Sequence, residues 1–296
     1  RIAELATRSG ANVVKVDVEW GRSVEPGALE AKLKELGDVK AVAVVHCETS
    51  TGVLQPLGDL AALAHARDAL LIVDTVASLG GADVPVDLLG IDVAYSGSQK
   101  CLGCVPGLSM VTLSERAAEV VNTRKTVSTS WYLDVGLLKD YWITGRKYHH
   151  TTASSLTYAL HQALRLVLDE GLPAVFARHE ANSRALRSGV DAMGLSMAAS
   201  EDVQSPTVHA VLMPDGVDSN QVRRALMDEH RIETGGGLGI FAGRAIRIGL
   251  MGHSSRRANV LSVLSALESV LDGMGYEIAA SAGVEAAQRS WMSETG

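Results

Sequence analysis

Two residues that could do chemistry together lie at the ends of apolar segments in this sequence. Lys100 follows the apolar run 91–95 on a loop of small residues, and Asp74 closes the run 69–73. A lysine amine that burial and neighbouring charges keep deprotonated attacks an aldehyde and forms a Schiff base. A carboxylate beside an aromatic ring nitrogen keeps that nitrogen protonated, so that the ring accepts electrons. The residues alone leave two other interpretations open, a solvated loop lysine and an aspartate that caps a following helix.

The elements that would position these residues alternate between strands and helices. The expected strands are 13–18, 39–46, 69–74, 91–96 and 108–114, and the expected helices are 26–36 and about 57–67. This alternation predicts an α/β fold with a mostly parallel sheet and helices on both faces. Because ligands in such sheets bind at the carboxyl ends of the strands, we expect Glu48, Asp74 and Lys100 to share one edge.

The second half of the chain has a different pattern. It predicts long helices at 155–172 and from Pro173 to about 193, and then a strand at 207–213, a helix at 219–230, a strand at 244–250 and a helix at about 255–273. We therefore predict a large domain at 1–172 and a smaller C-terminal α+β domain at 173–296. The tail from about 277 is rich in Ala, Ser and Glu, and we expect a frayed helix there.

The composition excludes several classes of protein. Hydrophobic residues make up 47% and charged residues 21%, with a net charge of −7 and no basic patch, which argues against nucleic acid or an anionic membrane as partner. No apolar run reaches the roughly 18–20 residues that span a bilayer. The three cysteines are too few for a disulfide framework and favour a reducing compartment, with the cytoplasm as the expected location.

Two short motifs could indicate a metal or redox site. Cys101 and Cys104 form a C-x-x-C, but no second pair accompanies them, so small residues on a crowded loop are the favoured interpretation. His149 and His150 are adjacent on a segment expected to be extended, where their side chains would point to opposite sides. We therefore expect no metal site.

Five motifs in order along the chain resemble one enzyme family. They are HCETSTGVLQPL (46–57), VDTVASLGG (73–81), YSGSQKCLGCVPG (95–107), YHHT (148–151) and RIGLMG (247–252). Together they resemble the class V, fold-type I aminotransferases that depend on pyridoxal 5′-phosphate. They are most similar to the alanine–glyoxylate, serine–glyoxylate and pyridoxamine–pyruvate group. The resemblance covers nearly the whole chain and implies transamination between a small amino acid, alanine or serine, and a 2-oxo acid, glyoxylate or pyruvate.

The resemblance also implies roles for particular residues. Lys100 would hold the cofactor covalently and shuttle the proton, and Asp74 would face the pyridine nitrogen. Thr49 would lie near the ring substituents, and Gln99 near the phosphate. Tyr148 and Thr151 would reach the phosphate of the neighbouring subunit, in a homodimer with shared sites or a tetramer built from it. Arg247 would bind the substrate carboxylate through its planar fork.

The sequence departs from the family in two places. The family has a further N-terminal segment, with a glycine-rich phosphate loop and an aromatic residue that stacks on the ring, and we expect the sequence to be a truncated record of a longer enzyme. Pyridoxamine–pyruvate aminotransferases carry an extra arginine nine residues before the carboxylate-binding one. Leu238 stands there in this sequence, as in the alanine–glyoxylate type.

Other functions remain as alternatives. A class V lyase or desulfurase would keep the cofactor, but desulfurases use a mobile cysteine in the small domain, and every cysteine here precedes residue 105. A nucleotide-binding module would need a phosphate-binding glycine motif that the sequence lacks. A truncated relic would keep the fold without activity. The amino donor, the acceptor and the pathway are not encoded in any motif that we find.

Overall fold

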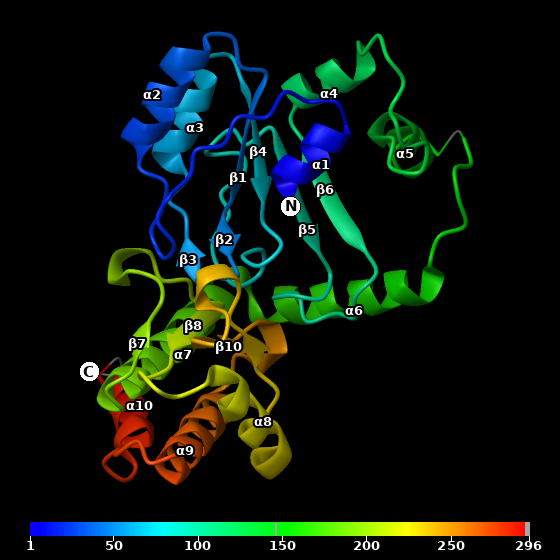
Figure 1. The fold of residues 1–296 in the computed structure, drawn as a ribbon. Coiled ribbons are helices and arrows are strands. Elements are labelled where there is room, and N and C mark those ends of the chain that lie inside the picture. The colour runs from blue at the N-terminus through cyan, green and yellow to red at the C-terminus, as the bar shows by residue number, and fades with distance from the viewer. Residues whose placement is uncertain (146, 294–296) are drawn as a thin grey trace.

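The computed structural model describes residues 1–145 and 147–293 (Figure 1). The first sheet has the strand order β1-β4-β5-β6, in which β1, β4 and β5 are parallel and β6 is antiparallel. Its strands are β1 (Ala41–Val45), β4 (Leu70–Asp74), β5 (Val93–Gly97) and β6 (Ser109–Leu113). The helices of this half are α1 (Ile2–Arg8), α2 (Pro26–Leu36), α3 (Gly58–His65), α4 (Glu115–Asn122) and α5 (Val135–Trp142). The α/β fold with a mostly parallel sheet is confirmed.

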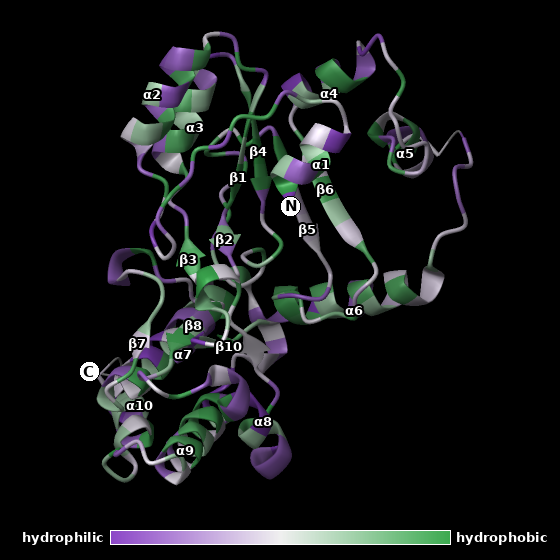
Figure 2. Ribbon diagram, viewed as in Figure 1, coloured by the Kyte–Doolittle hydropathy of each residue, from purple (hydrophilic) through white to green (hydrophobic). Residues whose placement is uncertain are grey.

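Apolar residues on successive strands hold this sheet against α3. Leu71 and Val73 of β4 are completely buried and pack with Leu57, Ala61 and Ala64. Helix α2 lies beside α3 (Figure 1), and the two helices pack through Leu29, Leu33 and Leu60. Figure 2 shows β1 and β4 as mainly hydrophobic, whereas α2 combines hydrophilic and hydrophobic residues.

The predicted strand at 13–18 is wrong. The structure has no strand among these residues, which belong to the long connection from α1 to α2 (Figure 1). Alternating apolar residues form a strand only where a neighbouring strand offers hydrogen bonds, and neither edge strand of the first sheet, β1 or β6, pairs with residues 13–18.

The second sheet has the strand order β7-β8-β10-β9 and is antiparallel throughout. Its strands are β7 (Ser196–Met197), β8 (Val208–Leu212), β9 (Gly235–Gly236) and β10 (Ala245–Gly249). Helix α6 (Ser154–Glu170) leads from the first half of the chain into this one, whose helices are α7 (Leu172–Ala192), α8 (Ser219–His230), α9 (Arg257–Gly273) and α10 (Ala282–Met292). No helix in the described part of the chain is long and apolar enough to cross a membrane.

The C-terminal tail is packed rather than frayed, so that expectation is wrong. Helix α10 buries Ala287 and Trp291 in the same core as Leu186 of α7 and Leu267 of α9. The small residues of its inner face allow this approach, and Arg257 lies over the Trp291 ring at 5.1 Å from the centroid.

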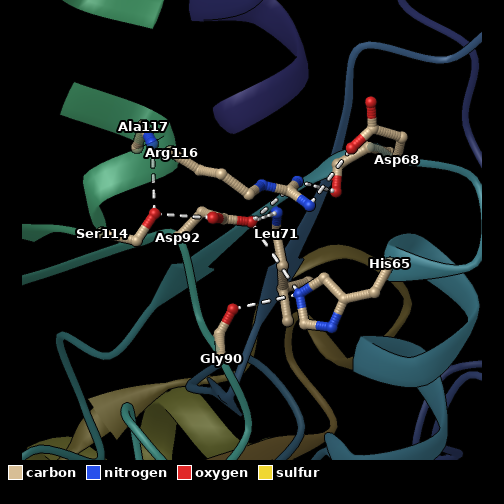
Figure 3. Close-up of polar contacts among 9 residues, drawn as sticks. His65, Asp68, Leu71, Gly90, Asp92, Ser114, Arg116 and Ala117 are labelled. Atoms are coloured by element: carbon tan, nitrogen blue, oxygen red, sulfur yellow. Dashed lines mark hydrogen bonds and ion pairs between the residues drawn. The ribbon is translucent and has the colours of Figure 1, made fainter. Parts of the chain in front are cut away.

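A polar network closes the amino-terminal edge of the first sheet, opposite the strand ends expected to carry the chemistry (Figure 3). Asp92 is 2% exposed. Its carboxylate accepts hydrogen bonds from the Leu71 amide at 2.8 Å and the Ser114 hydroxyl at 2.6 Å. Arg116 Nη2 approaches it to 3.4 Å and also donates to the Ala69 carbonyl, and His65 Nε2 lies at 3.9 Å. One buried carboxylate thus ties β4, β5, α3 and α4 together.

We expect Asp92→Ala to lower the free energy of unfolding by about 3 kcal/mol, because it leaves a buried amide, a hydroxyl and a guanidinium without their acceptor. Urea unfolding of the variant and the parent would measure the loss. Asp68→Asn is the matched control, since Asp68 contacts the same Arg116 from a side chain that is 98% exposed. A loss for Asp92→Ala no larger than that of the control would contradict the role of the network.

Candidate active site

The carboxyl ends of β1, β4 and β5 form the candidate site. Val45, Asp74 and Tyr95 are aligned across the three parallel strands. The chain then continues from β1 into the ribbon of β2 (Cys47–Glu48) and β3 (Val53–Leu54), with Thr49 in the intervening turn. The loop that follows β5 carries Lys100. The expected meeting of these residues at one edge of the sheet follows from this register.

Asp74 is held at the end of β4 by two donors. Oδ1 accepts from the Val76 amide at 2.9 Å, and Oδ2 accepts from the Tyr95 hydroxyl at 2.9 Å. Turns rather than a helix follow Asp74, so the alternative of a helix-capping aspartate is wrong. Burial and the hydrogen bond to Asp74 raise the pKa of Tyr95, so the phenol stays protonated and donates.

Sequence reasoning assigned no role to Tyr95, although it lies in the YSGSQK motif. The signal was available in the strand pattern. Residues 74 and 95 are neighbours in the parallel register, and side chains at paired positions lie on the same face of a sheet.

Lys100 lies in a loop that its own backbone fixes. The Ser98 amide donates to the Leu108 carbonyl at 3.1 Å, and its hydroxyl donates to the Val105 carbonyl at 2.7 Å. The Gly103 amide closes a turn on the Lys100 carbonyl at 2.9 Å. Among the hydrogen bonds and ion pairs of residues 1–145 and 147–293, none involves the Lys100 amine. The amine is half-buried and available to a ligand.

The cysteines beside Lys100 are structural. Cys47, Cys101 and Cys104 are free thiols. Burial raises the pKa of the Cys101 thiol to about 12, and burial also raises that of Cys47, so both stay protonated and unreactive at neutral pH. A Cβ on Gly81 would lie 2.7 Å from Cys101 Sγ. This close approach explains the small residues that surround the lysine loop.

Arg247 of β10 reaches the site from the second sheet. Its Nη1 donates to the Thr49 carbonyl at 3.0 Å, and its Nε donates to the Gly236 carbonyl at 2.7 Å. Burial and the neighbouring charge of Arg223 lower its pKa from a high starting value, and Glu48 opposes them. A guanidinium stays charged at neutral pH under such a shift. The two contacts fix its plane and leave further N–H groups for a carboxylate.

A backbone contact joins the end of β10 to the lysine loop. A Cβ on Gly252 would lie 2.6 Å from the Cys101 carbonyl oxygen. The Gly252 amide donates to Nε2 of the buried His179 at 2.9 Å, and Arg178 Nη1 donates to the Gly252 carbonyl at 3.0 Å. Sequence reasoning missed both α7 residues, because they act only through packing between distant segments.

Of the remaining predicted residues, Gln99 lies next to Lys100 in the same loop, whereas Tyr148 and Thr151 lie outside this cluster. Gln99 is exposed, and its side-chain oxygen lies where a Cβ on Gly97 would approach to 2.7 Å. The Tyr148 and Thr151 hydroxyls are 2.7 Å apart in the loop between α5 and α6. Figure 1 shows the stretch from residue 147 to the start of α6 away from the carboxyl ends of β4 and β5. Tyr148 is 70% exposed.

The expected arrangement of His149 and His150 is wrong. Their Nδ1 atoms are 2.8 Å apart, and His149 stacks on Trp131 with ring centroids at 4.1 Å. The two rings therefore lie against each other at an interplanar angle of 89° instead of pointing to opposite sides. Within residues 1–145 and 147–293, no three His, Cys, Asp or Glu side chains could hold a metal ion together.

Buried histidines make the fold sensitive to acid. Burial lowers the pKa of His46 to about 4 and that of His209 to about 3. Below pH 6.5 the unfolded chain takes up protons that the folded chain does not, so stability falls as the pH drops towards 4. We expect each histidine to cost about 2 kcal/mol between pH 7 and pH 5. Urea unfolding at the two pH values would test this, and equal stabilities would contradict it. In His46→Gln the pH dependence should shrink by about half.

Comparison with known proteins identifies the family. Residues 1–252 match the family described as Aminotransferase class-V. The chain belongs to the class V aminotransferases. This aminotransferase is 41% identical to (S)-ureidoglycine–glyoxylate transaminase of Bacillus subtilis, over 91% of this chain and 69% of the relative.

Solved structures agree with this assignment. Ureidoglycine–glyoxylate aminotransferase from Bacillus subtilis has a TM-score of 0.94, covering 98% of this chain and 74% of that one. Alanine–glyoxylate aminotransferase from a Nostoc species is 44% identical with a TM-score of 0.88, covering 91% and 71%. Among the related sequences, pyridoxamine–pyruvate transaminase of Mesorhizobium japonicum is 34% identical over 95% of this chain and 72% of the relative.

The cofactor of this class V aminotransferase is pyridoxal 5′-phosphate, and its substrates are an amino acid and a 2-oxo acid. The residues at the strand ends fit the cofactor. Each Asp74 oxygen accepts one hydrogen bond and keeps a lone pair for the N–H of a ring. The Lys100 amine is unengaged among the contacts described above, as an aldehyde-bearing ligand requires.

Proposed function

We propose that this class V aminotransferase transfers the amino group of alanine or serine to glyoxylate or pyruvate. The observation that carries the proposal is the position of Arg247, whose guanidinium is fixed by the Thr49 and Gly236 carbonyls beside the strand ends. A planar fork held in this way suits a substrate carboxylate. Two of the relatives described above are named for glyoxylate, which supports a small 2-oxo acid as acceptor.

Each site residue has a proposed task. Lys100 holds the cofactor and then, as a free amine, moves the proton to and from the substrate α-carbon, which typically gives ~10²–10⁴-fold. Asp74 holds the proton of the ring nitrogen, and Tyr95 fixes the orientation of that carboxylate. Thr49 holds the ring substituents of the cofactor, and Gln99 holds its phosphate. Bound pyridoxal phosphate supplies the electron sink that makes the α-hydrogen acidic.

We propose that the enzyme is a homodimer in which Tyr148 and Thr151 complete the phosphate site of the partner subunit. The 70% exposure of Tyr148 and its contact with Thr151 in the loop between α5 and α6 support this assignment. Trp131, Tyr132 and Trp142 are each more than half exposed on the same face, where a subunit contact would cover them. Co-expressing Lys100→Ala and Tyr148→Ala chains should restore activity, because a mixed dimer keeps one intact site. Two inactive variants that remain inactive together would contradict sharing.

A second candidate is pyridoxamine–pyruvate transamination, which the 34% identical relative favours. Leu238 argues against it, because that position carries an extra arginine in the pyridoxamine enzymes. Leu238 is 45% exposed at the end of the glycine run, so a side chain there can reach a ligand.

We further propose the domain division at 172/173, supported by separate cores on either side, and a cytoplasmic location.

The test uses the enzyme extended to its natural start, loaded with pyridoxal phosphate. Alanine, serine, (S)-ureidoglycine and pyridoxamine are added separately, and the absorbance is followed until the cofactor reaches its amine form. Conversion by alanine or serine, reversed by glyoxylate or pyruvate, supports the proposal. Conversion by pyridoxamine or ureidoglycine alone would replace the donor. Elimination products without conversion would indicate a lyase, and a protein that never binds the cofactor would indicate a relic.

A further inference from the structure

Strand β9 is a glycine ribbon that lies against two arginines. It pairs with β10 so that Gly235 faces Arg247 and Gly236 faces Ile246. A Cβ on Gly235 would lie 3.3 Å from Arg247 Nη2, and a Cβ on Gly236 would lie 3.0 Å from Arg223 Nη1. Consecutive residues of a strand face opposite sides, so the two guanidiniums lie on either face of the ribbon.

Hydrogen bonds connect the two arginines through this ribbon. Arg223 extends from α8, and its Nε donates to the Thr234 carbonyl at 2.9 Å. Two residues further on, the Gly236 carbonyl accepts from Arg247 Nε at 2.7 Å. Glycines have no side chains to restrict their backbone, so a ribbon of them needs outside contacts to stay in place. The Arg223 contact is one of these.

The charges of Arg223 and Arg247 also indicate that the two side chains act together. The positive charge of Arg223 contributes to the lowered pKa of Arg247, so the two guanidiniums are close enough to repel each other. None of the ion pairs formed within residues 1–145 and 147–293 involves either of them. The charge of Glu48 also acts on Arg247 but forms no ion pair with it, so the two like charges still favour a bound anion beside Arg247. A bound carboxylate at Arg247 meets that requirement.

We propose that Arg223 is a positioning residue for the substrate carboxylate: it anchors β9, thereby orients the Arg247 guanidinium, and adds its own charge to the field there. This role rests on the proposed function, in which Arg247 binds the carboxylate. No motif in the sequence marks Arg223, because its effect passes through a backbone carbonyl of another element.

The test measures carboxylate binding apart from catalysis. Propionate has a carboxylate but neither an amino nor an oxo group, so it binds without reacting. Its dissociation constant is measured by calorimetry on the full-length enzyme loaded with pyridoxal phosphate. We expect Arg223→Met to weaken propionate about tenfold while the absorbance of the bound cofactor stays unchanged. The KM for the amino donor should rise by a similar factor and kcat should change much less.

The neighbouring arginine provides a matched control. Arg224 lies on the same helix and is exposed, and Arg224→Met removes the same charge at a position without a contact to β9. We expect wild-type affinity from it. Equal affinities of Arg223→Met and Arg224→Met would overturn the proposal. If Arg223→Met does not fold, Arg223→Lys replaces it. That variant should weaken propionate about threefold, since the ammonium cannot reproduce the Nε contact, and wild-type affinity would overturn the proposal.

Arg247→Met separates this proposal from the proposed function. If it binds propionate as the parent does, the assignment of Arg247 to the carboxylate fails, and the role of Arg223 fails with it. If Arg247→Met loses propionate while Arg223→Met keeps it, only the role of Arg223 fails. If Arg247→Met and Arg223→Met both lose propionate affinity and Arg224→Met keeps it, the proposed function and the role of Arg223 are both supported.

Discussion

Replacing Lys100 by alanine is expected to abolish transamination by the full-length enzyme. The residue has two tasks in the proposed site, holding the cofactor and moving the proton at the α-carbon. The second task alone is worth ~10²–10⁴-fold in rate, and loss of the covalent link adds to it. The surrounding loop is fixed by the backbone bonds of Ser98 and Gly103, so the variant should fold normally.

Absorbance and single-turnover kinetics would measure this effect. The band of the lysine-bound cofactor should be absent from Lys100→Ala, and added alanine should convert almost none of the cofactor within the time the parent needs. Lys100→Arg keeps the charge without a useful nucleophile and should be equally inactive. Turnover of Lys100→Ala within tenfold of the parent would rule out the assignment.

The second large effect is expected at Asp74. In Asp74→Asn the side chain keeps its shape but loses the negative charge that would hold the ring nitrogen protonated. A hydrogen bond to a charged group contributes about 3 kcal/mol, which corresponds to about 10²-fold in the rate of proton removal. Because the residue mainly serves the transition state, kcat should fall more than the KM for the amino donor rises.

Two further variants sharpen the test at Asp74. Tyr95→Phe removes the donor to Oδ2 but leaves the charge, so we expect a smaller loss, about tenfold. Asp83→Asn changes an exposed carboxylate nearby in the chain and should behave as the parent. An Asp74→Asn enzyme as fast as the Asp83→Asn control would contradict the pairing with the ring nitrogen.

The sequence predicted the elements whose signal is local. β1 and β4 follow from continuous apolar runs, and α8 and α9 follow from helical spacing. The strand expected at 13–18 failed because pairing depends on a neighbour that the residues do not encode. Helices α4 and α5 were not expected, although Ser114 and Asp134 cap their first turns in the usual way. Helix α10 was expected to fray because its small residues look weak until α7 and α9 cover them.

The residues of the candidate site also fall into those that local sequence motifs predict and those that only the assembled structure reveals. Asp74 closes β4, Lys100 follows β5 and Arg247 lies in the middle of β10, each within a motif, and parallel topology brings the first two to one edge. Tyr95 acts through strand register, and His179 and Arg223 act through backbone groups of distant segments. Their contribution becomes visible only when the strands and helices are assembled.

The contact between Gly252 and Cys101 has a consequence for substrate choice. Gly252 follows Arg247 by five residues, and Cys101 directly follows Lys100, so this main-chain contact sets the span between the proposed carboxylate grip and the amine. Since no side chain fits between the two backbones, the main-chain distance between these segments is fixed, and the Arg247 guanidinium is held further by its contacts with the Thr49 and Gly236 carbonyls. This fixed spacing favours substrates in which one particular number of bonds separates the carboxylate from the reacting carbon. With Arg247 as the proposed carboxylate-binding residue, we expect α-amino acids to react faster than β- or γ-amino acids, because each extra bond moves the reacting carbon further from the arginine.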